Sequence, residues 1–541
     1  MRFTKSFLTL LLAALAIAGP RARCQAIPTG TQSTAIYVDG AKGSDINSNA
    51  TITGTSVAPL QTIQAAINLA NTRNMQNIGT KIVVNPGVYR EALNISGGQT
   101  TAPLTIEAAT AGLTVISGSD LLTGWSSDGN GVYSHSWTYN FGTCAVPNGW
   151  PSFGTIGRRT EMIFVNGASM TEVLSMSALT TRSFYVNASN HTIYVKPPSG
   201  TNMYTANVET AVRPQILSIS GRSNVVLRGV VLEHARSCVN TSGSIISGGS
   251  NILVDNVQAV WNNWGGLLIS GSYNVTVQNS VFSFNGGVGF LGNRIVGALF
   301  SYDKSDYNNW RGAQAHFYNW GMGGTKLMYM RNTTVQYLHA YGNQAQGLWF
   351  DTDNKNITIN NVSLGGNTLS ALQIEANEGP ILLENSHLCN SGMGVTVLNT
   401  EKFTIKNNVF YDNGGTGQQY DAEIFIAGRP GGHVIYDWQT GQYYDLFTKD
   451  TILSGNVFDD ARSGQQVFGT YLSGGDWYDF ANTLNSSSNH WHDPVTAAAW
   501  KLPNGKSATF TGWKSAVGTD YTSVWASPST SPAGACAVAA Q

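Results

Sequence analysis

The sequence has few charged residues for its length, and the two signs nearly cancel. Lysine and arginine total 30 and aspartate and glutamate total 31 of 541 residues, which gives a formal net charge of -1. This balance provides no basic surface for nucleic acid and no electrostatic attraction to an anionic membrane. We therefore expect neither nucleic acid nor a membrane to be a partner of the mature protein.

Cysteine is scarce as well. Four cysteines follow the N-terminal segment, namely Cys144, Cys238, Cys389 and Cys536. Their spacings match no zinc-binding pattern, so no zinc site is expected. A large core does not need disulfides, even where export permits them. We expect buried thiols, with one disulfide at most.

Long apolar runs are missing beyond the N-terminus, so no membrane helix is expected there. Arg2 and Lys5 precede an apolar run from Phe7 to Ala18. Such a run is typical of a secretory signal and is too short to span a bilayer comfortably. We predict a signal peptide at residues 1–26 and a secreted or periplasmic protein.

What the chain does have is 60 glycines and a spaced series of apolar strand residues. Five steps of this series are 22 to 27 residues, about one turn of a solenoid. The step of 58 is expected to contain an irregular excursion near residues 292–324, and the step of 48 fits two coils with a long loop at residues 428–444. The series is Leu227, Val254, Val277, Val335, Ile359, Leu383, Ile405 and Leu453.

Asparagines lie in or beside the turns that follow many of these strands, and asparagine tolerates left-handed turns and bonds from coil to coil. We predict structural ladders for Asn256, Asn279, Asn361, Asn385, Asn408 and Asn456.

The ends and the middle of the chain differ from the coils. Residues 58–70 have helical apolar spacing and would cap the open end of a solenoid. We assign residues 27–116 to this cap and the first coils, 117–205 to a β-rich insertion, 206–500 to the coils with active-site loops, and 501–541 to a C-terminal tail.

Two acidic residues stand out because they repeat at the coil period. The runs Leu348 to Asp351 and Leu372 to Glu375 are offset by 24 residues. Equivalent residues of neighbouring coils lie about 4.8 Å apart. Strand alternation turns Asp351 and Glu375 to the same outer face. Two carboxylates held roughly 5–5.5 Å apart are the catalytic groups of a retaining glycosidase.

The opening Tyr37 to Gly40 and the segment at residues 58–66 resemble the start of many secreted carbohydrate-active β-helices. The fold that this resemblance implies is all-β: a right-handed parallel β-helix of the pectate-lyase type, with an N-terminal capping helix and a β-rich insertion. The segments at residues 347–351 and 374–380 resemble the β-helical β-xylosidases of glycoside hydrolase family 120. That resemblance implies Asp351 as the nucleophile and Glu375 as the acid/base, but the sequence gives no basis for xylose as the substrate.

Other side chains are candidates for holding an oligosaccharide or polysaccharide. Sugar rings stack on aromatic faces and sugar hydroxyls need directed partners, and loops on a rigid scaffold often supply both. The loop at residues 428–444, with Arg429 and His433, is expected to form a second wall, and Glu423 is a lesser outward carboxylate. The substrate-binding candidates are Trp349, Asp353, Asn377, Glu378, Trp310, Arg311, His316, Trp320, Lys326 and Trp438.

Two other functions remain open at this stage. In a polysaccharide lyase, Lys326 would be the base, and Asp351, Asp353 and Glu375 would hold calcium. A non-catalytic carbohydrate-binding or adhesive β-helix would use the same aromatic residues without turnover. For a hydrolase, no cofactor is required, although calcium is possible.

Overall fold

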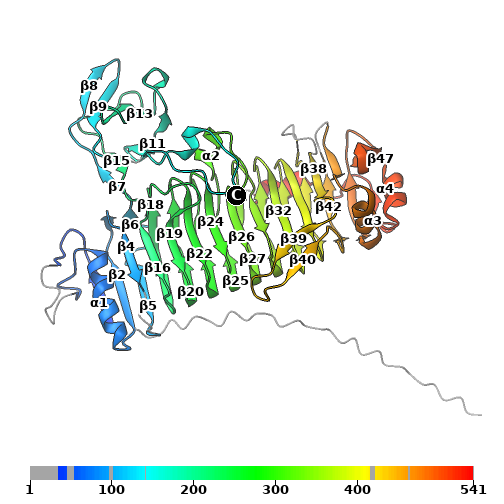
Figure 1. The fold of residues 1–541 in the computed structure, drawn as a ribbon, viewed down its shortest axis with the longest axis horizontal. Coiled ribbons are helices and arrows are strands. Elements are labelled where there is room, and N and C mark those ends of the chain that lie inside the picture. The colour runs from blue at the N-terminus through cyan, green and yellow to red at the C-terminus, as the bar shows by residue number, and fades with distance from the viewer. Residues whose placement is uncertain are drawn as a thin grey trace, which may run out of the picture.

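A computed structural model describes residues 34–45, 54–96, 101–139, 142–414, 421–460 and 464–539. The predicted signal peptide lies outside these residues. Three parallel sheets wind along one long axis and form a parallel β-helix (Figure 1). Most coils contribute one strand to each sheet, and the apolar side chains between the sheets form the core.

Sheet A contains β1 (Thr34–Val38), β2 (Thr80–Val84), β5 (Leu104–Ala108), β17 (Val225–Arg228), β20 (Ser250–Asp255), β23 (Tyr273–Gln278), β25 (Val296–Ser301), β27 (Arg331–Gln336), β30 (Lys355–Asn360), β33 (Ile381–Glu384), β36 (Phe403–Lys406), β41 (Ile452–Ser454) and β44 (Asn485–Ser487).

Sheet B has two parts: β3 (Gly87–Tyr89), β6 (Thr114–Ser117), β18 (Val230–Glu233) and β21 (Gln258–Val260), and then β28 (His339–Tyr341), β31 (Ser363–Gly365), β34 (His387–Cys389), β37 (Val409–Tyr411), β42 (Val457–Asp459), β45 (His490–His492) and β48 (Val524–Trp525).

Sheet C carries the acidic pair. Its strands are β4 (Leu93–Ser96), β16 (Leu217–Ser220), β19 (Ser242–Ser247), β22 (Gly265–Ser270), β24 (Val288–Asn293), β26 (Gly323–Met328), β29 (Leu348–Asp351), β32 (Ser370–Asn377), β35 (Met393–Thr400), β38 (Ala422–Ala427), β43 (Gln466–Thr470), β46 (Trp500–Lys501) and the antiparallel β47 (Ser507–Ala508).

The coils repeat because apolar side chains alternate along each strand and asparagines fill the corners. Phe350 on β29 and Ile374 on β32 point into the core and are fully buried. Asn256 and Asn279 adopt left-handed turn conformations, with φ of 54° and 53°. Asn408 donates from its side chain to Asn456 at 3.0 Å in a buried ladder. The predicted ladder is confirmed for Asn408 and Asn456, whereas Asn361 and Asn385, like Asn256 and Asn279, occupy left-handed turns.

Two of the predicted steps between coils need correction. The 58-residue step contains an additional regular strand, because Val277 pairs with Phe300 on β25 and Phe300 pairs with Val335. The 48-residue step is one coil and not two, because Ile405 pairs directly with Leu453. Its additional length forms the antiparallel hairpin of β39 (His433–Tyr436) and β40 (Tyr443–Leu446).

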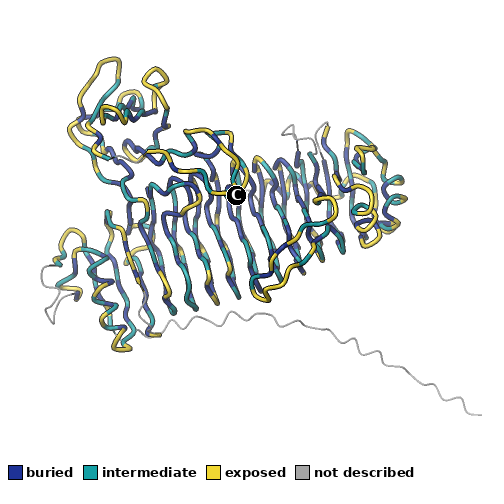
Figure 2. Tube along the Cα trace, viewed as in Figure 1, coloured by how far each residue is buried: buried dark blue, intermediate teal, exposed yellow. Residues whose placement is uncertain are grey.

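Helix α1 (Ile63–Met75) covers the N-terminal end of the coils (Figure 1). The Thr62 side chain caps it by accepting a hydrogen bond from the Ala65 backbone N–H. Ile63 and Ile67 on its inner face are fully buried. Figure 2 shows that most of the tube along the coils is buried or intermediate, whereas exposed stretches gather in the insertion and the loops. The helix begins five residues later than the sequence pattern indicated, because Leu60 pairs with Val38 of β1 and the backbone N–H groups of Gln61 and Thr62 donate to Asp45.

The expected C-terminal tail continues the fold. It contains η3 (Pro503–Gly505), α4 (Phe510–Val517) and β48, and α3 (Gly474–Thr483) precedes it. Helix α5 (Pro532–Ala539) lies back against β34 and β37, so the C-terminus is near the middle of the molecule (Figure 1). A disulfide between Cys389 and Cys536 joins α5 to the coils.

The insertion rises from one side of the β-helix near its N-terminal end (Figure 1). It includes η1 (Thr155–Arg158) and η2 (Met176–Ala178), and it has its own core. Its strands are β7 (Ser119–Leu121), β8 (Ser126–Gly129), β9 (Val132–Ser136), β10 (Ile163–Val165), β11 (Ala168–Ser169), β12 (Thr171–Val173), β13 (Ser183–Asn187), β14 (Thr192–Lys196) and β15 (Val208–Ala211).

Ion pairs and a disulfide fasten the insertion to the coils. Arg311 on α2 (Trp310–Gln314) lies 2.8 Å from Glu172, and both side chains are buried. Cys144 and Cys238 form a second disulfide. The prediction of buried thiols with at most one bridge is therefore wrong, because all four cysteines are paired. Among the described residues, no helix is long and apolar enough to cross a membrane.

Candidate active site

The two repeated acids lie side by side on sheet C. Asp351 at the end of β29 is the direct register partner of Glu375 on β32. Adjacent strands are about 4.8 Å apart, so the two side chains leave the sheet next to each other. Leu398 follows Glu375 in register and Met328 precedes Asp351, so the acidic column has two members.

Lys326 on β26 fixes one member of the pair. Its Nζ atom is 2.7 Å from Asp351 Oδ2 and donates to the Trp320 carbonyl oxygen at 2.5 Å. It also lies 3.4 Å above the Trp349 ring, because Lys326 and Trp349 are register partners. Thr352 donates its hydroxyl hydrogen bond to Asp351 Oδ1 at 2.8 Å. Both oxygens of Asp351 therefore have a donor.

Glu375 has a different environment. Burial raises the pKa of the Glu375 carboxyl above its ordinary value, and the negative charge of Asp351 raises it further. A hydrogen bond from the Gln373 amide, 2.8 Å long, and the charges of Lys326 and Arg429 oppose this rise without cancelling it. Asp351 is thus held by hydrogen-bond donors, whereas Glu375 has a raised pKa and keeps its proton to higher pH than an ordinary glutamate.

A cavity of about 200 Å³ opens beside Asp351 and Lys326. Its walls come from sheet C, from the loop before β26, from the turn before β19 and from the segment of the insertion between β9 and η1. Trp150 from that segment of the insertion lies 6.0 Å from Trp320, measured between ring centroids. The lining residues are Trp150, Asn240, Thr241, Ser242, Trp264, Val288, Leu291, Trp320, Gly321, Lys326, Met328 and Asp351.

The segment leading into the β39–β40 hairpin affects the acidic pair through its charges. The charge of Arg429 lowers the pKa of Glu375, and burial together with Arg429 lowers the pKa of His433. The charge of Asp351 acts on His433 in the opposite direction. Arg429 and His433 are thus close enough to the acids for their charges to interact, and the second wall stays a prediction.

Asp353, predicted to contact substrate, is fully buried and does not join the pair. Its Oδ2 atom lies 2.8 Å from Arg331 Nη2 and accepts a hydrogen bond from the Trp438 backbone N–H. Thr352 and Asp353 have φ of 48° and 55°, so the chain turns after Asp351 and strand alternation ends there. The prediction that Asp353 contacts substrate is therefore wrong.

Glu378 and Trp438 belong to the surroundings of Asp353 and not to the cavity. Glu378 Oε2 lies 2.8 Å from Lys355 Nζ, which also lies 2.6 Å from Asp437 Oδ2. Trp438 donates its indole hydrogen bond to the Tyr329 carbonyl oxygen at 3.1 Å. We call the group of Arg331, Lys355, Asp353, Glu378 and Asp437 the ionic clamp.

Asn377 and Glu423 were predicted to be accessible and are fully buried. The Asn377 side chain donates to the Phe350 and Glu375 carbonyl oxygens as part of a corner ladder. Glu423 accepts hydrogen bonds from the backbone and side chain of Asn413 at 3.0 and 2.6 Å. Both side chains serve the turns between strands, and neither reaches the cavity.

Several aromatic and basic candidates fasten loops. Arg311 is buried in its contact with Glu172, and the Trp310 indole donates to the Phe284 carbonyl oxygen. Trp349 is covered by Lys326, so its face is not open to a sugar as predicted. His316 is exposed. Of the predicted contacts, only Trp320 and Lys326 line the cavity beside Asp351.

A lyase would need calcium, and a hydrolase could bind it. The proposed ligand set of Asp351, Asp353 and Glu375 is not assembled, because Asp353 belongs to the ionic clamp. The carboxylates of Asp353, Glu378 and Asp437 do lie within 4.8 Å of one another. Arg331 and Lys355 already lie between them, so the donor set does not fit a divalent cation.

Comparisons with known proteins bear on the fold. A family model described as a right handed beta helix region matches residues 242–421. No curated protein sequence matches the chain. The structure of XylC in complex with xylose is similar, with 14% identity and a TM-score of 0.67, covering 91% of this chain and 86% of that chain.

Two A-modules of mannuronan C-5 epimerases from Azotobacter vinelandii are also similar. The AlgE6 module has 16% identity and covers 86% of this chain and 94% of its own, and the AlgE4 module has 14% identity and covers 91% and 100%. Both have a TM-score of 0.50. The chain is a right-handed parallel β-helix. The fold predicted from the sequence is confirmed.

Proposed function

We propose that the protein is a retaining glycoside hydrolase that acts on an oligosaccharide or polysaccharide, with Asp351 as the nucleophile and Glu375 as the acid/base. The observation that carries this proposal is the register pairing of the two acids in unlike environments. A retaining glycosidase needs this combination, because one carboxyl group must donate a proton while the other attacks.

The reaction would proceed in two displacements. In the first, Glu375 donates its proton to the glycosidic oxygen, the bond from that oxygen to the anomeric carbon breaks, and Asp351 forms an ester to the anomeric carbon. In the second, the Glu375 carboxylate takes a proton from water, the water oxygen attacks the anomeric carbon, and the ester to Asp351 breaks. Atoms and charges balance over the two steps, and the anomeric configuration is retained.

Lys326 and Thr352 would act on the nucleophile by position and charge. Their donors hold the two oxygens of Asp351, which fixes the carboxylate on the side of the cavity. Lys326 is itself held by the Trp320 carbonyl oxygen and the Trp349 ring, so its charge stays beside Asp351. A fixed charge loses little free energy to reorganisation when the reaction begins.

A carbohydrate substrate also suits the cavity. Trp150 and Trp320 offer aromatic surface for a sugar ring, and Asn240, Thr241 and Ser242 offer hydrogen-bonding groups. XylC, which has a similar fold, was solved with xylose bound, and this supports the carbohydrate class without naming the sugar here. The predicted signal peptide would place the enzyme outside the cytoplasm.

The direct test is hydrolysis of a panel of aryl glycosides and of plant and microbial polysaccharides by the purified mature protein. We expect activity that Asp351→Asn and Glu375→Gln each remove. Glu384→Gln, the same type of change on sheet A, is the matched control and should keep full activity. Full activity in Asp351→Asn on a confirmed substrate would contradict the assignment.

The leaving group separates the two roles. Glu375→Gln should retain more activity on aryl glycosides with acidic phenol leaving groups than on alkyl glycosides, because only the latter need a protonated leaving group. Asp351→Asn should lose activity on both substrates. Equal losses in the two variants on every leaving group would argue against Glu375 as the acid.

A further inference from the structure

The β39–β40 hairpin lies over the backbone that follows Glu375. Ile435 and Leu446 on its inner side are buried together with Ala376, the residue immediately after Glu375. Ala376 is itself fully buried, with φ of 55°. The hairpin therefore covers the residue next to the proposed acid/base.

The hairpin is joined to the coils through the ionic clamp. Asp437 follows β39 directly and is 1% exposed. Its Oδ1 atom lies 2.9 Å from Arg331 Nη2 on β27, and its Oδ2 atom lies 2.6 Å from Lys355 Nζ on β30. One hairpin carboxylate thus binds two cations from neighbouring coils.

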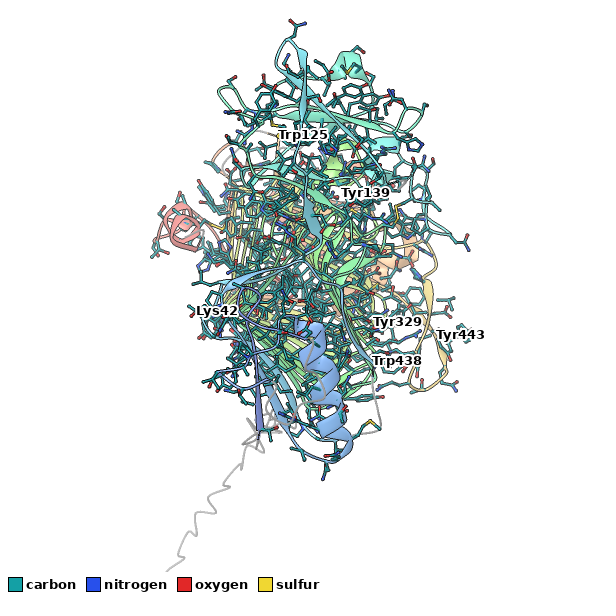
Figure 3. The ribbon with its side chains drawn as sticks, turned by 90° about the vertical axis from the view of Figure 1, so that its left-hand side faces the viewer. Lys42, Trp125, Tyr139, Tyr329, Trp438 and Tyr443 are labelled. Carbon is teal, nitrogen blue, oxygen red and sulfur yellow. A yellow bond between two sulfur atoms is a disulfide. The ribbon has the colours of Figure 1, made fainter. Side chains whose placement is uncertain are left out.

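Further contacts of the same segment fix its orientation. Gln439 accepts a hydrogen bond from Arg331 Nε at 2.9 Å, and the Trp438 backbone N–H donates to Asp353. The Trp438 ring lies beside Tyr329, whereas Tyr443 lies farther out on the hairpin (Figure 3). The ionic clamp is therefore a buried attachment and not a surface ion pair.

The clamp also explains why Asp437 stays charged. Burial opposes its ionisation, but hydrogen bonds from Lys355 and from the backbone N–H groups of Gln439 and Thr440 outweigh burial and hold the pKa of Asp437 well below its ordinary value. Arg331 also binds Asp353, and Lys355 also binds Glu378. Each cation therefore keeps an acidic partner if Asp437 is replaced.

We propose that Asp437 is a positioning residue of the active site, which holds the β39–β40 hairpin against Ala376 and thereby keeps Glu375 away from water. The catalytic consequence rests on the proposed function, whereas the attachment of the hairpin does not. Loss of the attachment would admit water to Glu375 and make its proton easier to lose. The general acid would then be ionised over more of the working pH range.

The other groups that affect the pKa of Glu375 must stay unchanged if the effect of Asp437 on this pKa is to be measured. They come from β29, β26, β32 and the hairpin segment itself. These groups are Asp351, Lys326, Gln373 and Arg429, together with His433 near Asp351. None of the variants below changes any of them.

The test compares Asp437→Ala and Asp437→Asn with Asp445→Asn, which removes a carboxylate from the exposed side of β40 and is the matched control. Hydrogen exchange of peptides covering residues 433–446 reports the attachment. The titration of Glu375 in protein labelled with ¹³C at the glutamate carboxyls reports its burial, with Glu375→Gln to assign the signal.

We expect the hairpin to exchange faster and Glu375 to titrate at lower pH in both Asp437 variants. Both changes should be larger in Asp437→Ala than in Asp437→Asn, and the Asp445→Asn control should show neither. Asp437→Glu, which keeps the charge, should restore part of both. For alkyl glycosides, kcat should fall about tenfold at the upper end of the pH range while KM changes little, because general acid catalysis is weakened.

Two outcomes would overturn the proposal. Unchanged hairpin exchange in Asp437→Ala would mean that Asp437 does not hold the hairpin. Faster exchange with an unchanged Glu375 titration would mean that the hairpin is attached there but does not shield Glu375. If the wild-type protein hydrolyses no glycoside, the proposed function fails, and exchange and titration still decide the role of Asp437.

Discussion

Replacing Asp351 by Asn removes one negative charge beside Glu375 with almost no change of volume. In the wild-type protein this charge raises the pKa of Glu375, in addition to the effect of burial. Asp351→Asn should therefore lower the pKa of Glu375, so that Glu375 releases its proton at lower pH. The direction follows from the register pairing alone and does not depend on the substrate.

The magnitude can be worked from the strand spacing. Two unit charges about 5 Å apart interact by roughly 3 kcal/mol at an effective dielectric constant near 20. Lys326, 2.7 Å from Asp351, cancels part of this interaction. We expect the proton affinity of Glu375 to fall by roughly tenfold, which corresponds to about 1.4 kcal/mol.

The assay is the ¹³C titration of glutamate-labelled protein described above, applied to wild type and Asp351→Asn. Lys326→Met provides a control of opposite sign, because loss of that cation should raise the pKa of Glu375. An unchanged Glu375 titration in Asp351→Asn would show that the two carboxyls do not interact, and the proposed mechanism would then lose its basis.

Three other predictions concern the scaffold and the site. Phe350→Ala should lower the free energy of unfolding by about 3–5 kcal/mol in a denaturant titration, because the ring is fully buried in the core. A loss below about 1 kcal/mol would contradict that packing. Asp303 is 3% exposed, and burial raises its pKa to about 8. Since its unfolded pKa is near 3.9, the folded state holds a proton that the unfolded state releases, and stability falls as pH rises from about 4 to about 8. Asp303→Asn should flatten this dependence in thermal unfolding between these pH values, and an unchanged slope would be inconsistent with a protonated Asp303. Chelation by EDTA should leave hydrolysis unchanged, because the clustered acids around Asp353 already bind cationic side chains, and loss of activity that calcium restores would refute this interpretation.

The acidic pair could be predicted because residues one coil apart in the sequence become neighbours on adjacent strands of a parallel β-helix. The 24-residue offset between Asp351 and Glu375 contains no insertion, so it specifies the register directly. The long loop between β25 and β26 interrupts the period, so the strands between Val277 and Val335 could not be aligned from spacing alone.

Positions beyond the strand ends could not be derived from alternation. Thr352 and Asp353 both have left-handed backbone, and the Asp353 side chain turns into a buried ion pair that no local pattern reveals. Trp150 reaches the cavity from within the insertion, far from Asp351 in sequence. Asp437 and its two cations are likewise brought together only by the folded hairpin.

The central claim is that Asp351 forms a covalent bond to the sugar. The most direct measurement is mass spectrometry of the protein after incubation with a 2-deoxy-2-fluoro glycoside bearing a good leaving group, made from the sugar that the activity panel identifies. We predict one glycosyl group per chain, located on Asp351 by peptide fragmentation and absent in Asp351→Asn. A label on another carboxylate, or hydrolysis with inverted anomeric configuration, would contradict the account.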